Sequence, residues 1–189
     1  MILCWNGQLE QGQIHEFAYC HSRNLIARSV LRLTRWLRAR NAARYILSDR
    51  GPLLDVGCGD GYFLRYTGLP ESHGFDKLLS DTWGGLSQFN EHYFSYVTLL
   101  AVIEHLPDPQ VINTRLWRVL KPGGWLILTT PIRQSERLIQ FYAPNIDEEH
   151  KNYYDLESMN ALLHGKYRLV EYRHFLLGLN QLFCYERLV

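Results

Sequence analysis

The sequence has few cysteines, no long apolar run and almost no net charge, and each feature argues against a class of protein. Four cysteines (Cys4, Cys20, Cys58 and Cys184) are far apart and form no Cys-x-x-Cys pair, which disfavours a disulfide framework or a structural zinc site. No apolar run approaches the roughly 18 residues of a transmembrane helix, and the first residues lack a signal-peptide pattern. We therefore expect a single soluble domain in the reducing cytoplasm.

The formal net charge of +1 hides one strongly basic segment. Eight of the sixteen arginines lie between His21 and Arg50, where Asp49 is the only acid. The spacing of Ile26, Val30, Leu33 and Leu37 predicts a helix with one apolar face. Arg28, Arg32 and Arg35 fall on the opposite face. Beyond Arg38 this phase breaks, which predicts a bend or a second short helix.

Three interpretations of this segment remain open. It is a surface helix that packs on the domain with solvated arginines, or it docks on a membrane or another anionic surface through Arg28, Arg32 and Arg35. The third interpretation is contact with nucleic acid, which is the least favoured because the rest of the chain has no comparable basic stripe. The oligomeric state is not indicated by any pattern.

After Arg50, predicted strands and helices alternate. We expect strands at 53–56, 72–76, 93–100 and 125–130, and a short helix that ends near Tyr66. Two further helices would begin at the caps Asp108 and Asp155 and end at about Leu120 and Gly165, with the run 121–124 separating the first of them from the next strand. Paired strands at 167–175 and 180–188 would end the chain. This order predicts an α/β, Rossmann-like fold with a mainly parallel sheet, helices on both faces and a C-terminal antiparallel hairpin. Residues 1–48 would form an N-terminal arm and basic helices packed on a domain at 49–189.

The most informative stretch is the run LLDVGCGDGYFL at 53–64. A buried strand enters a turn with Gly57, Gly59 and Gly61, where a ligand can approach the backbone closely. Asp76 ends the next predicted strand, where a carboxylate can accept hydrogen bonds from both ribose hydroxyls of a nucleoside. The glycine spacing is G-x-G-x-G rather than the G-x-G-x-x-G of dinucleotide sites, and Asp55 would disfavour a pyrophosphate. This chemistry favours a ligand with an amino group and a sulfonium, which is S-adenosylmethionine.

This run resembles motif I of the class I S-adenosylmethionine-dependent methyltransferases. Three further stretches follow in the family's order: GFDK at 74–77, VTLLAVIEHLPDP at 97–109 and VLKPGGWLILTTP at 119–131. The resemblance implies that the cofactor is S-adenosylmethionine and that the reaction is methyl transfer. It covers residues 50–131, and the C-terminal strands match the family's closing hairpin.

The resemblance also implies roles for individual residues. Gly57, Gly59 and Gly61, with Cys58 between them, would line the methionine and ribose portions, and Asp55 would fix the amino group. Asp76 would bind the ribose hydroxyls, and Lys77 or Leu78 would flank the adenine. The backbone at Leu100 and Ala101 would meet the methionine moiety. Cys58 itself we interpret as a small packing residue rather than a nucleophile.

One segment departs from the family pattern. Only seventeen residues (77–93) separate Asp76 from the next strand, which barely exceeds one crossover connection. The edge strand after Asp76 should therefore be abbreviated or missing. Asp81 would then be the candidate substitute for the acid or amide that usually contacts the adenine in this family.

Candidate catalytic or substrate-binding residues lie after the third predicted strand and before the last predicted helix. Methyl transfer mostly needs the acceptor to be held close and aligned, and a hydroxyl acceptor also needs a general base. Glu104 and His105 are candidates for that base or for a substrate contact, as is His150; alternatively the first two orient a loop and the third lies in a solvated loop. Ubiquinone-pathway O-methyltransferases resemble this region, and some hold a metal with E-x-x-E-H. Ala101 occupies the first position here, so we expect no metal.

The leading hypothesis is an enzyme that methylates a small molecule. A second is a methyltransferase-like binding or scaffold protein with an impaired pocket. A third is a membrane-surface enzyme that acts on a lipid-linked or polysaccharide precursor. A nucleic-acid substrate is disfavoured because no N-P-P-Y-type signature follows the third strand.

Overall fold

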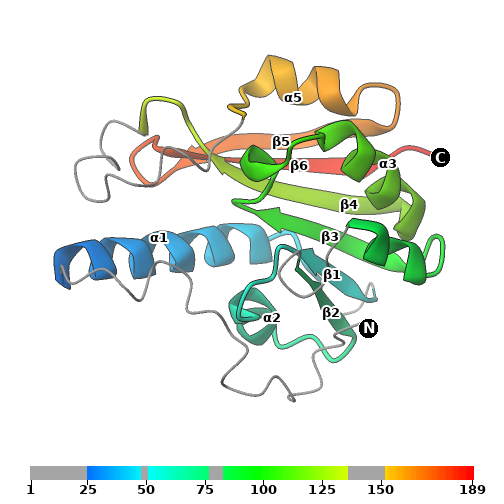
Figure 1. Ribbon diagram of the computed structural model, residues 1–189, viewed down its shortest axis with the longest axis horizontal. Helices are drawn as coiled ribbons and strands as arrows, with labels where there is room; N and C mark the ends of the chain where they lie inside the picture. Colours follow the sequence, from blue (N-terminus) through cyan, green and yellow to red (C-terminus); the bar gives the residue numbers. More distant parts are fainter. Residues whose placement is uncertain (1–24, 48–50, 77–82, 136–151) are drawn as a thin grey trace.

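A six-stranded sheet forms the centre of the computed structural model, which describes residues 25–47, 51–76, 83–135 and 152–189 (Figure 1). The strand order is β2-β1-β3-β4-β6-β5. The strands are β1 (Leu53–Val56), β2 (Ser72–Phe75), β3 (Phe94–Leu100), β4 (Leu120–Pro131), β5 (Tyr167–Phe175) and β6 (Asn180–Arg187). The predicted strands are therefore all present, with ends shifted by one or a few residues.

In the spatial order of the sheet, the first four strands are parallel, and β6 alone runs in the opposite direction between β4 and β5. β1 pairs in parallel with β2 and β3, and β3 pairs in parallel with β4. β6 runs antiparallel to both β4 and β5, with Asn180 opposite Pro131. β6 thus begins at the edge where the parallel strands end. The predicted Rossmann-like fold with a C-terminal hairpin is confirmed, and β2 is the outer strand on its side among the described residues.

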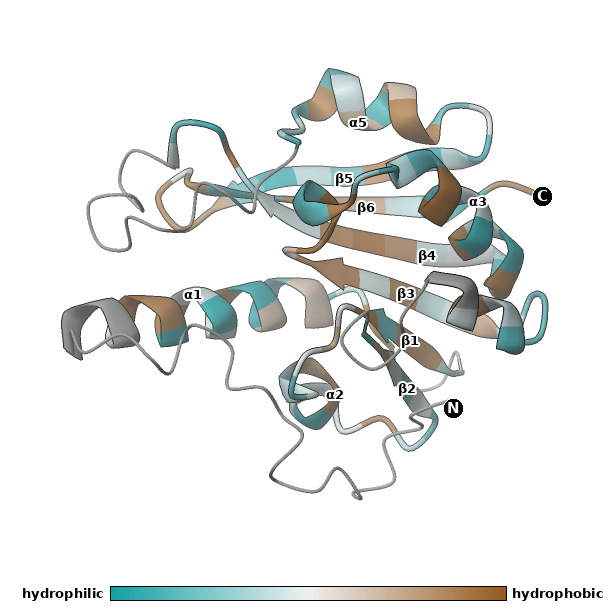
Figure 2. Ribbon diagram, viewed as in Figure 1, coloured by the Kyte–Doolittle hydropathy of each residue, from teal (hydrophilic) through white to brown (hydrophobic). Residues whose placement is uncertain are grey.

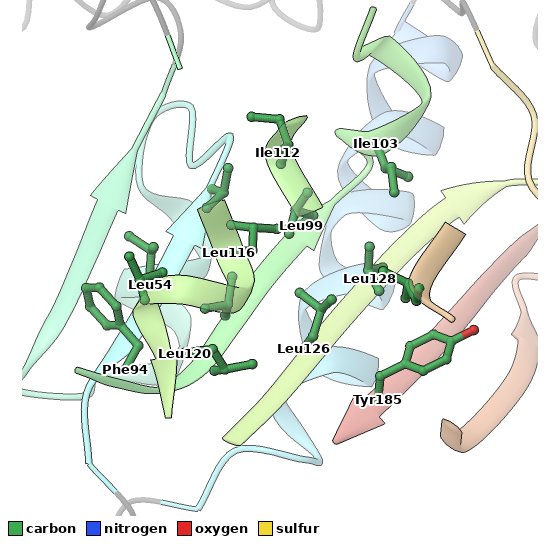
Figure 3. Packing of buried hydrophobic residues seen from close by; sticks show 14 of the residues in the cluster. Leu54, Phe94, Leu99, Ile103, Ile112, Leu116, Leu120, Leu126, Leu128 and Tyr185 are labelled. Carbon is green, nitrogen blue, oxygen red and sulfur yellow. The ribbon is translucent and has the colours of Figure 1, made fainter. Parts of the chain in front are cut away.

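Helices cover both faces of the sheet. α1 (Leu25–Ala43) and α2 (Tyr62–Thr67) lie on one face, and α3 (Pro109–Val119) and α5 (Leu156–Leu163) lie on the other (Figure 1). Leu54, Leu99 and Leu126 point toward Ile112 and Leu116 of α3 (Figure 3). Alternate residues such as Leu53, Tyr96 and Ile127 pack instead against Ala39 and Ala42 of α1. The parallel part of the sheet is therefore covered on both faces, although β4 has exposed residues near its start.

Two helices begin at the capping residues that the sequence predicts. The Asp108 carboxylate accepts hydrogen bonds from the backbone N–H groups of Gln110 and Val111, with Pro109 as the first helical residue. Asp155 and Ser158 form a reciprocal capping box at the start of α5. Both arrangements satisfy N–H groups that have no partner within the helix.

Two predicted boundaries are wrong. The run Lys121–Gly124 does not separate α3 from β4, because β4 begins directly at Leu120 opposite Phe94. The extra residues are absorbed as an irregularity, since Tyr96 pairs with Trp125, and Gly123 has a φ of 72°. The predicted bend beyond Arg38 is also absent, because α1 is continuous to Ala43 and Arg40 is exposed to solvent.

The orientation of α1 differs from the predicted one, although Arg32 is exposed as expected. Val30 and Leu33, expected to pack on the domain, are 46% and 49% exposed. The side chains of Arg35 and Arg38 instead reach Asp60 and Asn180 of the domain. The inner side of the helix therefore combines contacts to polar groups of the domain with the buried residues Ala39 and Ala42. Figure 2 shows apolar and polar residues alternating along α1.

Candidate active site

The glycine turn lies where β1 ends. The Gly57 N–H donates to the Phe75 carbonyl at 2.7 Å, which ties the turn to β2. Gly57 has a φ of 76°, and a Cβ added to it would lie 2.3 Å from Cγ2 of Val102. Because both the dihedral angle and the space exclude a side chain, glycine is required here. The turn is consequently pressed against the segment that follows β3.

Asp76 is bound to the same turn. One of its carboxylate oxygens accepts a hydrogen bond of 2.8 Å from the Gly59 N–H. The residue is 7% exposed and directly follows β2. The predicted ribose-binding acid and the glycine turn are therefore held together by a direct contact.

Asp55 is a buried acid beside them, 3% exposed within β1. The Thr98 hydroxyl donates to its carboxylate at 2.6 Å. Burial raises the pKa of Asp55 to about 7; the charge of Asp76 adds to this, and the Thr98 hydrogen bond and Arg35 oppose it. A cation bound next to this carboxylate would stabilise its charged form.

Cys58 serves packing within this turn. Its Sγ atom lies against β2, where a Cβ added to Gly74 would be 2.7 Å away. Burial raises the pKa of the Cys58 thiol, and the charges of Asp55 and Asp76 raise it further. A thiol held neutral in this way is a poor nucleophile. Gly61 closes the turn by donating its N–H to the Cys58 carbonyl at 2.8 Å.

The end of β3 has an unusual backbone. Leu100 is its last residue, and Ala101 has a φ of 60°, which is uncommon for a residue with a side chain. The Ala101 N–H donates to the Thr129 carbonyl at 2.8 Å, so the conformation is fixed by β4. Strained backbone of this kind is concentrated at functional sites. The bend places Leu100 and Ala101 beside the glycine turn through Val102.

Glu104 and His105 follow in a short 3-10 helix, η4 (Ile103–His105). Glu104 is 1% exposed, and its carbonyl accepts from the Asn152 N–H at 3.1 Å. Burial raises the pKa of the Tyr154 hydroxyl, and the charge of Glu104 raises it further. The segment before α5 is therefore attached to η4. His150, Lys77 and Asp81 lie outside the described residues, so their predicted roles stay predictions.

The sequence alone did not identify several residues that the fold brings to the edge of the sheet where the parallel strands end. Asp60, inside the glycine turn, pairs with Arg35 of α1, whose guanidinium lies 4.3 Å from the centre of the Tyr62 ring. Gln181 of β6 accepts a hydrogen bond from the Tyr172 hydroxyl at 3.0 Å. Thr130 of β4 is buried, and its hydroxyl has no hydrogen-bond partner among the described residues. Polar residues inside otherwise apolar strands were the available signal.

The charges of the site indicate which ligand it suits. Asp76 and, when ionised, Asp55 lie beside the glycine turn, and their negative charge would repel a pyrophosphate, whereas the charge of Asp60 is paired with Arg35 and Arg65. A nucleoside that carries a cationic group matches the same acids through its ribose hydroxyls and its charge. The donor set therefore fits S-adenosylmethionine. No group of three or more His, Cys, Asp or Glu in the described part of the chain could hold a metal ion.

Comparison with known proteins agrees with this geometry. The model of the methyltransferase domain family (Methyltransf_23) matches residues 22–166. The chain belongs to this family. Among solved structures, a SAM-dependent methyltransferase from Archaeoglobus fulgidus is similar, with a TM-score of 0.60, 21% identity and coverage of 82% of this chain and 94% of that chain. A protein from Pyrococcus horikoshii has a TM-score of 0.58, 18% identity and coverage of 90% and 95%.

Curated relatives match shorter stretches of this methyltransferase-family chain. A ubiquinone biosynthesis O-methyltransferase from Hydrogenovibrio crunogenus is 28% identical over 41% of this chain and 42% of the relative. A phosphoethanolamine N-methyltransferase from Caenorhabditis elegans is 38% identical over 22% of this chain and 10% of the relative. The chain thus spans less than half the length of these two relatives.

Proposed function

We propose that this protein transfers a methyl group from S-adenosylmethionine to a small-molecule acceptor. The observation that carries the proposal is the contact between Asp76 and the Gly59 N–H, beside the buried Asp55. This arrangement offers acceptors for ribose hydroxyls and a negative charge for an amino group at one end of β1. Membership of the methyltransferase family and the fold support the same reaction.

The residues of the turn would hold the cofactor. Asp76 binds the ribose, Asp55 binds the amino group directly or through water, and the backbone of Gly57, Gly59 and Gly61 allows close approach. Bound S-adenosylmethionine would supply the methyl group of its sulfonium to an acceptor oxygen, nitrogen or carbon, with S-adenosylhomocysteine as the leaving group. The chain's contribution is to align the acceptor and to exclude water.

The acceptor would lie on the side of Ala101 toward β4 and β6. Glu104, Thr130 and Gln181 provide buried polar groups at that edge of the sheet. His105 is the described residue best suited to receive the proton that a hydroxyl acceptor loses, because histidine accepts protons near neutral pH. The names of the curated relatives, O- and N-methyltransferases of small compounds, support this acceptor class.

A label-transfer assay tests the proposal. The protein is incubated with S-adenosylmethionine labelled in its methyl group and with panels of phenols, catechols, amines, nucleic acids and proteins. We expect label only in a small phenol or amine. Transfer should be lost in Asp76→Ala and retained in Asp108→Ala, the control, which removes the acid that caps α3. Label in a macromolecule alone would contradict the acceptor class.

The role of His105 is tested with the acceptor found in that assay. We expect His105→Asn to lower kcat by about 10²-fold or more with little change in KM, because general-base catalysis contributes on that scale. An unchanged kcat would assign proton removal to another residue.

A further inference from the structure

The outer side of α1 carries an apolar stripe. Val30, Leu33 and Trp36 are 46%, 49% and 37% exposed. Their spacing of three residues places them along one side of the helix, about 60° apart in projection. Single exposed apolar residues are ordinary, but three large ones in a row on one helix form a continuous surface.

This exposure follows from how α1 is attached. On the inner side, Arg35 pairs with Asp60, and the Arg38 Nε donates to the Asn180 side chain at 3.2 Å. Further along, Arg173 donates to the Asn41 side chain. Ala39 and Ala42 are buried between these contacts. Polar groups from three separate parts of the domain therefore hold the apolar stripe outward.

Positive charge flanks the stripe. Arg32 and Arg40 are exposed, and the guanidinium of Arg40 lies 5.1 Å from the centre of the Trp36 ring. α1 contains no acidic residue along its whole length. The outer side of the helix thus combines aliphatic side chains, a tryptophan and arginines without any negative charge. Interfacial membrane helices have this composition.

We propose that the outer side of α1, formed by Val30, Leu33, Trp36, Arg32 and Arg40, docks on an anionic lipid surface. The apolar side chains enter the boundary between headgroups and acyl chains, and the arginines contact lipid phosphates. No described helix is long and apolar enough to cross a membrane, and the proposal concerns a helix that lies on the surface. This contact differs from the one that the sequence predicts, because Arg35 is held by Asp60 instead of facing outward.

Other occupants fit the stripe less well. Nucleic acid would be gripped by the arginines but would leave Val30 and Leu33 against a charged backbone. A second copy of the chain would bring like-charged arginines together across a two-fold interface. An anionic bilayer satisfies both the charge and the apolar side chains.

The position of α1 gives docking a consequence for the site. α1 packs on α2, β3 and β4, and Figure 1 shows its N-terminal half projecting past the carboxyl ends of the parallel strands. The glycine turn and Ala101 lie at those ends. A protein docked in this way would hold its candidate active site close to the bilayer surface.

Vesicle flotation tests the proposal with the full chain. Native protein should float with vesicles of phosphatidylcholine and phosphatidylglycerol and remain unbound with phosphatidylcholine alone. The double variant Leu33→Ser/Trp36→Ser should partition about tenfold or more weakly onto these vesicles, because two apolar side chains that would enter the membrane are removed. Arg40→Gln should lose about fivefold, and this difference should shrink at high salt.

Matched controls separate the stripe from general surface effects. Val111, 44% exposed on α3, is the apolar control as Val111→Ser, and Arg168 on β5 is the charge control as Arg168→Gln. Both should float like native protein. Trp36 should also shift its fluorescence to shorter wavelength with anionic vesicles, a change that Trp36→Phe abolishes.

Several outcomes would overturn the proposal. One is native protein that does not float, and another is equal flotation of the stripe variants and their controls. A concentration-dependent dimer lost in Leu33→Ser would assign the stripe to self-association. Binding of RNA that depends on Arg40 but not on Leu33 would assign it to nucleic acid. None of these measurements depends on methyl transfer, so the two proposals fail separately.

Discussion

The two faces of the sheet are covered in different ways. On the α3 and α5 face, apolar side chains such as Leu116 (Figure 3) pack into the larger apolar cluster of the described residues, which also contains Met159. On the α1 and α2 face, a smaller cluster is bordered by ion pairs and hydrogen bonds from Arg35, Arg38 and Asn41. The first face supplies most of the folding free energy, since apolar burial is its main source.

The comparison indicates that one face of the sheet mainly stabilises the fold, whereas the other carries the candidate binding site. The acids of the candidate site lie at the end of the second face, where the charge of Asp76 raises the pKa of Asp55 and Asp60 is paired with Arg35. A buried carboxylate such as Asp55 costs stability. The apolar face opposite compensates for this cost and keeps the turn in place.

The largest expected effect is a cavity in the apolar face. Leu116→Ala should lower the free energy of unfolding by about 2–5 kcal/mol, because a fully buried leucine is lost and the surrounding core relaxes only in part. Urea unfolding followed by circular dichroism measures it. A loss below about 1 kcal/mol would show that this face is less important than its burial indicates.

The next largest effect is an increase in the free energy of unfolding. Asp55→Asn should raise the free energy of unfolding of the ligand-free protein at pH 8 by roughly 2–4 kcal/mol, since the native pKa of about 7 lies above the ordinary 3.8. Because the folded state binds the proton more tightly, native stability falls as the pH rises from about 4 to about 7. Urea unfolding across this pH range measures the slope.

Ligand binding should show the reverse dependence on pH. The amino group of S-adenosylhomocysteine favours ionised Asp55, so its affinity for native protein should increase between pH 6 and pH 8. Asp55→Asn should bind more weakly and with no such increase. Equal pH profiles for the two proteins would place the amino group away from Asp55.

The smallest effect on stability concerns the pair between α1 and the glycine turn. Arg35→Met should change the free energy of unfolding by less than about 1 kcal/mol, because both side chains of the pair are partly exposed. Arg38→Met serves as the matched variant on the same helix. A loss of several kcal/mol in Arg35→Met would show that the pair rather than the apolar core holds α1.

The comparison also explains which parts were predictable from sequence. The strand and helix segments follow from local hydrophobic patterns, and the caps at Asp108 and Asp155 and the glycine turn follow from local rules, since a positive φ or a free N–H group demands particular residues. The roles proposed for those turn residues rest on the same pattern and are not tested by it.

The orientation of α1 was not predictable in this way. Its inner side depends on Asp60 and Asn180, which lie far along the chain from Arg35 and Arg38. Amphipathic periodicity identifies two sides of a helix, but which one faces the domain depends on contacts with residues far along the chain, which include the packing of Ala39 and Ala42 as well as the ion pair. The contacts of Gln181 and Thr98 were hidden for the same reason, because strand register brings them to the site.

Calorimetric titration with S-adenosylhomocysteine tests the central claim most directly. Native protein should bind, Asp76→Ala should lose roughly 30-fold or more in affinity, about 2 kcal/mol, and Asp108→Ala should bind like native despite losing a helix cap. Equal binding by native protein and Asp76→Ala would remove the proposed ribose contact. No binding by native protein would contradict the methyltransferase proposal and favour a binding or scaffold role.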